Sequence, residues 1–355
     1  MEGSSVDVLL PFHKANEHFY SALKSLELSS YKNFNVILID DCIQDCRSSI
    51  MKKLENYELR FLYVRTKGNA GYGLALKLGT SKINSKYVAL MNSDDLIHPE
   101  RFVKQIEAIK SRDLCFTKMS RINQFNQNLP FLFGSILSSD YDPIFLLLGS
   151  YGANATWLMT AEWWDKNCFF DSELGLDWRI AMKSFLHTDF IYLNEPLYYY
   201  RKHSLQSSRT ERNYRNYDAI FRSWIALATE LKLDGMNRDI FDQFVIPDKL
   251  DARSLSKNSV NFYYIKNEVL SRIHNKNSRF EFQRLYKRRI LISNLINKKY
   301  SKNNLLELFW ASSEIPALLK DLTITLKVYL ISNIRVISQL ISRYLFKNSI
   351  LEVKK

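Results

Sequence analysis

Short apolar runs alternate with amphipathic segments over roughly the first 110 residues of the chain. Each run stops at a proline or at polar residues, as strands buried on both faces of a parallel sheet do. Asn16 precedes one amphipathic segment and is placed to cap a helix. The alternation predicts a mostly parallel sheet with helices on both faces. The predicted strands are Val6–Leu10, Val36–Ile39, Arg60–Val64 and Tyr87–Met91, and the predicted helices contain Phe19–Leu26, Tyr72–Leu78 and Pro99–Ile109.

The pattern is less regular between residues 110 and 200 and becomes helical beyond residue 214. Apolar runs predict strands at Ala153–Thr160 and Phe190–Leu193, and Ser172–Phe185 is typical of a turn followed by a helix. Val260–Ile265 carries the strongest strand signal of the later part. We therefore predict an α/β domain over residues 1–210 and a basic, mainly helical region over residues 211–355.

Charge separates these two regions. Residues 251–355 hold 20 lysine and arginine residues against 7 aspartate and glutamate residues, which accounts for the whole net charge of +13. Leu318–Phe346 has apolar residues on most turns and a basic residue every seven or eight positions. This combination suits a helix lying on anionic lipid, and a helical bundle with a solvated basic face is an equal alternative. No nucleic-acid-binding motif accompanies the basic residues, so we expect no nucleic-acid partner.

Cysteine usage and hydropathy indicate a protein of the cytoplasm. Cys42 and Cys46 have the spacing of half a zinc site, but no second pair of ligands follows, which favours reduced thiols. The polar N-terminus leads directly into the first predicted strand, so we expect no signal peptide. The most apolar stretch, Leu322–Phe346, is interrupted by Lys327, Arg335 and Arg343, which argues against a membrane-spanning helix.

Acidic residues stand directly after two of the predicted strands, at Asp40–Asp41 and at Asp94–Asp95. The carboxyl ends of parallel strands meet at one edge of the sheet, which is where ligands bind in open α/β folds. Neighbouring carboxylates suit a hard divalent cation, and such a cation would neutralise a diphosphate leaving group. Each pair taken alone could equally cap a helix or a turn.

The order of these pieces is more specific than any one of them. Strands ending in Pro11-Phe12-His13, in Asp40-Asp41 and in Asn92-Ser93-Asp94-Asp95 follow one another at a spacing that resembles the family 2 glycosyltransferases of the GT-A fold. Further along, Leu176-Asp177-Trp178 resembles the family's catalytic segment, and Tyr200-Arg201-Lys202-His203 resembles the end of a later family strand.

The resemblance implies a role for each matching residue. Asp177 would be the general base, and the donor would be a nucleotide-diphosphate sugar bound with Mg²⁺ or Mn²⁺. The implied metal residues are Asp94, Asp95 and His203, and the implied nucleotide-sugar-binding residues are Pro11, Phe12, His13, Asp40, Asp41, Gly71, Lys77, Asn92, Ser93 and Asp94.

Several positions depart from the family pattern. Asn92 replaces the usual first aspartate of an Asp-x-Asp motif, which predicts a weaker metal site. Leu176 stands where a glutamate often precedes the base, and Lys77 stands where asparagine is common. Gly71 lies near a position that can be arginine, so Lys67 or Lys77 could supply the positive charge.

The resemblance implies transfer of a hexose-like sugar to an acceptor hydroxyl with inversion. The implied setting is synthesis of a bacterial surface polysaccharide, lipopolysaccharide or capsule, on a glycan or lipid-linked acceptor at the inner face of the membrane. Two alternatives stay open. One is a catalytically inactive binding protein of this family, and the other is a different nucleotide-using α/β enzyme. The absence of a Gly-x-Gly-x-x-Gly or P-loop motif after the first strand weighs against the second.

Overall fold

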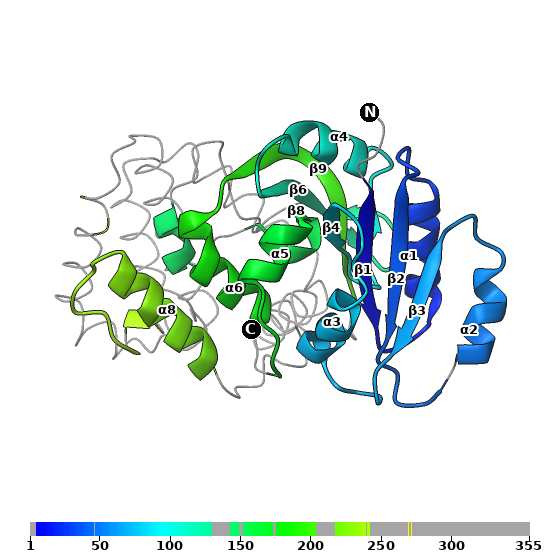
Figure 1. The fold of residues 1–355 in the computed structure, drawn as a ribbon, viewed down its shortest axis with the longest axis horizontal. Helices are drawn as coiled ribbons and strands as arrows, with labels where there is room; N and C mark the ends of the chain where they lie inside the picture. The colour runs from blue at the N-terminus through cyan, green and yellow to red at the C-terminus, as the bar shows by residue number, and fades with distance from the viewer. Residues whose placement is uncertain are drawn as a thin grey trace, which may run out of the picture. The chain divides into compact units, whose positions relative to one another are not determined.

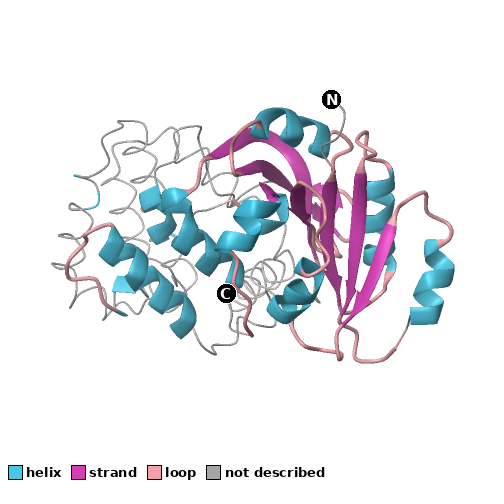
Figure 2. Ribbon diagram, viewed as in Figure 1, coloured by secondary structure: helices cyan, strands magenta, loops and turns pink. Residues whose placement is uncertain are grey.

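The computed structural model describes residues 5–45, 47–129, 143–148, 152–172, 175–203, 217–238 and 240–241, with single positions at 269 and 271. All of them belong to one compact unit formed by Met1–Leu129 and Gly134–Lys299. Figures 1 and 2 show this unit as a twisted sheet with helices packed on its two faces. The predictions for Val260–Ile265, for the domain boundary after residue 203 and for Leu318–Phe346 lie outside the described residues.

The described strands form a mixed sheet in the order β3-β2-β1-β4-β8-β6-β9-β5, with β7 pairing β6. β1 to β4 are parallel to one another, as predicted, whereas β8 joins β4 and β6 by antiparallel pairing. The sheet is therefore half parallel rather than mostly parallel. The strands are β1 (Val6–Phe12), β2 (Phe34–Asp40), β3 (Phe61–Arg65), β4 (Tyr87–Leu90), β5 (Leu96–Ile97), β6 (Leu114–Asn123), β7 (Asn128–Leu129), β8 (Leu158–Thr160) and β9 (Phe190–Lys202).

Helices cover both faces of this sheet, and successive residues of β1 contribute to opposite cores. Val8 packs with helices α1, α2 and α4, and Leu9 packs with α3, α5, α6 and α8. Both side chains are fully buried, which explains why apolar residues follow one another from Val8 to Leu10. The helices are α1 (Glu17–Glu27), α2 (Arg47–Leu54), α3 (Tyr72–Thr80), α4 (Arg101–Ile109), α5 (Ala161–Asn167), α6 (Leu176–Ser184) and α8 (Asp218–Glu230).

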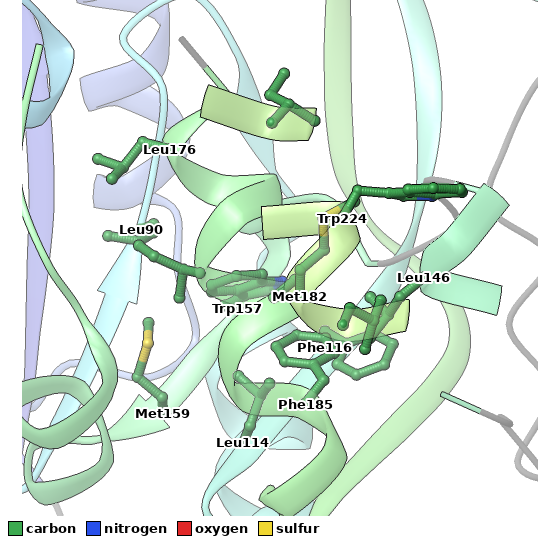
Figure 3. Close-up of a cluster of buried hydrophobic side chains, with 14 of the residues drawn as sticks. Leu90, Leu114, Phe116, Leu146, Trp157, Met159, Leu176, Met182, Phe185 and Trp224 are labelled. Atoms are coloured by element: carbon green, nitrogen blue, oxygen red, sulfur yellow. The ribbon is translucent and has the colours of Figure 1, made fainter. Parts of the chain in front are cut away.

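Aromatic side chains fill the core under α5, α6 and α8. Trp157, Phe116 and Phe185 pack together there, as Figure 3 shows. Trp224 of α8 is fully buried in the same core, and its indole Nε1 donates to the carbonyl oxygen of Leu147 at 2.9 Å. α8 therefore shares a core with the sheet, although it follows the predicted boundary at residue 210. That boundary stays a prediction.

The later elements differ from their predictions. Residues Asn154–Thr156 of the predicted strand form a 3₁₀ helix, η2, and only Leu158–Thr160 pairs as a strand. β9 continues from Phe190 to Lys202, passing Pro196 where the pairing with β6 shifts register. A register shift accommodates a proline because the proline cannot donate to the ladder. No helix within the described ranges is long and apolar enough to cross a membrane.

Candidate active site

The ends of β2, β1 and β4 lie side by side at one edge of the sheet. Phe12 pairs with Asp40, and Leu9 pairs with Leu90, two residues before Asn92. The register therefore brings the polar ends of the three strands together, as the strand-end rule predicts. At the end of β1, Pro11 is half-buried, Phe12 is buried against Phe19 and His13 is exposed.

The Asp40 carboxylate is fully buried at the end of β2 and is bound on both oxygens. Its Oδ1 accepts from the backbone N–H of Cys42 at 2.8 Å. Its Oδ2 accepts from the Arg65 guanidinium at 3.0 Å and from the Tyr63 hydroxyl. Arg65 and Tyr63 come from the neighbouring strand β3, so the charge is neutralised within one βαβ unit. The sequence prediction missed Arg65.

Asp41, the next residue, holds the loop of residues 66–71. Its carboxylate accepts from the Thr66 hydroxyl at 2.5 Å, from the Ala70 N–H at 2.7 Å and from the Gly71 N–H at 2.9 Å. Gly71 has φ of +91° and begins α3, and an added Cβ would meet nothing within 4 Å. Its backbone conformation, not crowding, therefore requires glycine. Lys67 and Lys77 are both exposed.

At the end of β4, the structure brings Asp94 and His203 together. The Asp94 Oδ2 and the His203 Nε2 lie 2.8 Å apart, although the two residues are 109 positions apart in the chain. The Asp94 side chain is 30% exposed and the His203 side chain 11%. The backbone oxygen of Asp94 accepts from Arg201 Nε at 2.6 Å. This pair is the part of the predicted metal site that keeps access to solvent.

Asp95 faces the opposite way, into the protein, and is fully buried. Its oxygens accept from the Asn92 amide, the Tyr198 hydroxyl and the Arg201 backbone N–H, each at 2.8 Å. Burial, followed by the negative charge of Asp94, raises the pKa of Asp95 to about 7. Ser93, the remaining predicted residue of this loop, is half-buried.

His18 lies beside this site and was missed by the sequence prediction. Its ring centroid is 5.1 Å from that of His203. Burial, then the charge of Arg201 and His203, lowers the pKa of His18. Its backbone N–H is capped by Asn16, as expected for the first turn of α1. A helix that follows β1 begins at the edge where β1 ends, and this is the signal that could have placed His18 here.

Asp177 lies in the first turn of α6, which packs near the start of α3. Gly73 of α3 approaches this segment so closely that a Cβ would lie 2.1 Å from the backbone oxygen of Asp171. Asp171 itself is held by Arg179 through two hydrogen bonds, at 2.9 and 2.5 Å. Asp177 is half-buried.

Tyr72, the first residue of α3, is influenced by the charge of Asp177. Its hydroxyl accepts from the Asn154 amide at 2.9 Å. Burial of the hydroxyl and then the charge of Asp177 raise the pKa of Tyr72 well above its ordinary value. Tyr72 directly follows Gly71, whose N–H binds Asp41. The segment of the predicted base and the loop bound by Asp41 therefore both lie near the start of α3.

The donor set at Asp94 and His203 suits a divalent cation. A carboxylate oxygen and an imidazole nitrogen that already lie within 2.8 Å of each other are ligands that Mn²⁺ accepts in proteins, and Asp94 keeps exposed surface. The described residues hold no group of three or more such ligands. A cation at this place would therefore complete its coordination with oxygen atoms of a ligand or of water.

Comparison with known proteins shows a similarity in the N-terminal part of the chain. Residues 7–139 match the family described as glycosyl transferase family 2. Glycosyltransferase GlyA of Streptococcus pneumoniae is 25% identical over 228 residues, which cover 58% of this chain and 32% of GlyA. The putative teichuronic acid biosynthesis glycosyltransferase TuaG of Bacillus subtilis is 26% identical over 112 residues, 32% of this chain and 44% of TuaG. The chain thus matches less than half the length of these two relatives.

A solved structure gives the same fold. Residues 1–349 of S. aureus TarS, crystallised with UDP-GlcNAc, superpose with a TM-score of 0.52 at 18% identity, over 80% of this chain and 79% of that one. This likeness confirms the predicted fold. Residues 7–139 therefore resemble glycosyl transferase family 2, and the sheet has the GT-A fold.

Proposed function

We propose that this chain transfers a sugar from a nucleoside-diphosphate donor to an acceptor hydroxyl, with inversion, in the synthesis of a bacterial surface polysaccharide. The observation that carries the proposal is the contact of Asp94 with His203 at 2.8 Å, beside the ends of β1 and β2. Two residues 109 positions apart meet at the edge of the sheet where open α/β folds bind ligands, which supports the proposal. The relatives named as glycosyltransferases and the TarS complex with UDP-GlcNAc support the same class of reaction.

Asp94 and His203 would hold a divalent cation, which supplies positive charge to the departing diphosphate when bound. Pro11, Phe12 and the Asp40–Asp41 turn would border the nucleotide. Asp177 would accept the proton of the acceptor hydroxyl, whose oxygen attacks the anomeric carbon while the bond to the diphosphate breaks. Asp95, whose two oxygens are already bound, would hold the loop rather than the cation.

A screen of sugar nucleotides tests the proposal. In the presence of Mn²⁺, one sugar nucleotide should raise the melting temperature and should release its nucleoside diphosphate when incubated with the protein. UDP-sugars are the first to test because TarS was solved with UDP-GlcNAc. The Asp94→Ala variant should fold normally and lose the Mn²⁺-dependent part of both signals. A protein that binds a sugar nucleotide but never cleaves it would instead be an inactive binding protein of this family.

We also propose that the basic region binds anionic lipid, which would place the site beside a lipid-linked acceptor. The support is the charge of residues 251–355, which equals the net charge of the whole chain. Exposed charges are screened within about 8–10 Å near physiological ionic strength, so binding to anionic vesicles should weaken with salt. Deletion of residues 318–355 should reduce sedimentation with such vesicles. Equal binding to neutral and anionic vesicles would exclude the electrostatic part of this proposal.

A further inference from the structure

Asn92 occupies the position where the family pattern has an aspartate, and its side chain makes a specific contact there. The Asn92 Nδ2 donates to the Asp95 Oδ2 at 2.8 Å. Asp95 is fully buried, so its carboxylate depends on protein groups for its hydrogen bonds. Asn92 is one of the three donors that satisfy it.

The other donors tie this loop to the end of β9. The Tyr198 hydroxyl donates to the Asp95 Oδ2 and accepts from the Asn92 backbone N–H at 3.2 Å. The Arg201 backbone N–H donates to the Asp95 Oδ1, and its side chain donates to the Asp94 backbone oxygen. We call Asn92, Asp95, Tyr198 and Arg201 the β4–β9 clasp. His203 follows Arg201 by two residues and contacts Asp94, so the clasp sets the position of both proposed cation ligands.

All three polar partners of the Asp95 oxygens are donors, so the contact from position 92 calls for a side chain that can donate. Asn92 donates through its NH₂ group, whereas an ionised aspartate has acceptors alone. An aspartate at this position would place two carboxylates within hydrogen-bond distance of each other, one of them fully buried. Like charges in such a place repel, and one buried oxygen would lose its donor. The Asn92 amide is therefore suited to its partner Asp95, and an aspartate at this position would not make the same contact.

We propose that Asn92 is a positioning residue, whose amide completes the β4–β9 clasp and thereby holds His203 against Asp94. The chain then binds its divalent cation through Asp94 and His203, with no carboxylate from position 92. The inference rests on the proposed function for the identity of the ligand, a divalent cation. It reverses the expectation that Asn92 merely weakens the metal site, because it predicts that restoring the aspartate harms the site.

Four variants of the full chain test this inference: Asn92→Asp, Asn92→Ala, Asp95→Asn and the double variant Asn92→Asp with Asp95→Asn. The measurements are the melting temperature and the Mn²⁺ dissociation constant by electron paramagnetic resonance, both without nucleotide. Loss of an outer-shell partner typically weakens metal binding about 10–100-fold. We expect a loss of that order, with a lower melting temperature, for Asn92→Asp, and a smaller loss for the uncharged Asn92→Ala. The double variant has one amide and one acid again and should recover part of the Asn92→Asp loss.

Two results would overturn the inference. One is tighter Mn²⁺ binding by Asn92→Asp at an unchanged melting temperature, which would make position 92 a ligand position. The other is wild-type behaviour of Asn92→Ala in both measurements. Neither readout needs a sugar donor, so the outcome is separate from that of the turnover screen. If the wild-type protein binds no Mn²⁺, the proposed metal dependence fails, and the melting temperatures alone decide whether the clasp exists.

Discussion

The two acidic strand ends at the same edge of the sheet are built in different ways. The Asp40–Asp41 pair is bound by partners within about 30 residues, on β3 and on the loop that leads to α3. The Asn92–Asp95 loop is bound by partners more than 100 residues later, at the end of β9. The first pair has both carboxylates occupied, and the second leaves Asp94 and His203 in contact with solvent. The Asp40–Asp41 end is thus a local structure, whereas the Asn92–Asp95 end is assembled only when β9 joins the sheet.

The largest expected effect is a loss of turnover at Asp177, which lies outside both acidic ends. Asp177 would act in the chemical step, whereas the two acidic ends would act in binding. General-base catalysis typically contributes about 10²–10⁴-fold. Asp177→Asn keeps the size of the side chain but cannot take the proton, so turnover should fall by that amount with nearly unchanged donor affinity. Initial rates and donor dissociation constants for both proteins provide the measurement. Near-normal turnover would transfer the role to another residue, with Glu173 as the next candidate because Arg179 holds Asp171.

Removing the Asp41 carboxylate at the local end should have a smaller effect, which lowers both the free energy of unfolding and the affinity for the donor. Asp41→Ala removes the acceptor of the Thr66 hydroxyl and of the Ala70 and Gly71 N–H groups. Leaving buried donors unsatisfied typically costs about 1–3 kcal/mol. Urea denaturation should show a loss of that order, and donor affinity should fall because the loop of residues 66–71 loosens. Glu55→Ala, at an exposed position, is the control. Full stability in Asp41→Ala would show that the loop holds itself.

The long-range end should differ from the local one in its pH dependence. The pKa of Asp95 is raised from 3.8 to about 7, so the folded protein favours the protonated form of this group. Its contribution to stability is fully present below the unfolded pKa, near 4, and is lost as the pH rises to about 7. Asp95→Asn has no such titration. In a metal chelator, the stability of the wild-type protein relative to this variant should therefore fall between pH 4 and pH 7.

A constant difference between the two proteins across this range would show that Asp95 titrates normally. Asp40→Asn is the matched comparison at the local end. Asp40 is paired with Arg65, whereas the contacts of the described residues give Asp95 no cationic partner.

The same division explains what the sequence could predict. The strands β1 to β4, the Asn16 cap and the meeting of the three strand ends depend on local patterns and on the geometry of parallel sheets, and all were predicted. β6 was not predicted, because its second half carries polar residues that pair with β9. Residues Asn154–Thr156 read as a strand but form η2.

Within the site, the acidic residues after β2 and β4 lie at the strand-end edge as predicted, but their partners were not foreseen. Arg65, Tyr198 and His18 act through contacts between separate elements, and no local pattern marks such contacts. Asn92 was predicted to weaken the metal site because it replaces an aspartate of the family pattern, and its contact with Asp95 was not foreseen. The orientation of the Asp95 side chain into the protein follows only from the position of β9, which supplies two of its partners.

The central claim is that Asp94 and His203 together hold the cation that binds the diphosphate. Calorimetric titration of UDP with Mn²⁺ and with chelator tests it directly, in wild-type protein and in the Asp94→Ala, His203→Ala and double variants. Coupled ligands typically change each other's affinity about 5–150-fold. We predict that Mn²⁺ increases the UDP affinity of the wild-type protein by a factor in this range and that each single variant loses this increase. The double variant should show no further loss because both residues serve one site. Equal UDP affinity with Mn²⁺ and with chelator in the wild-type protein, or a full Mn²⁺ effect in His203→Ala, would contradict the claim.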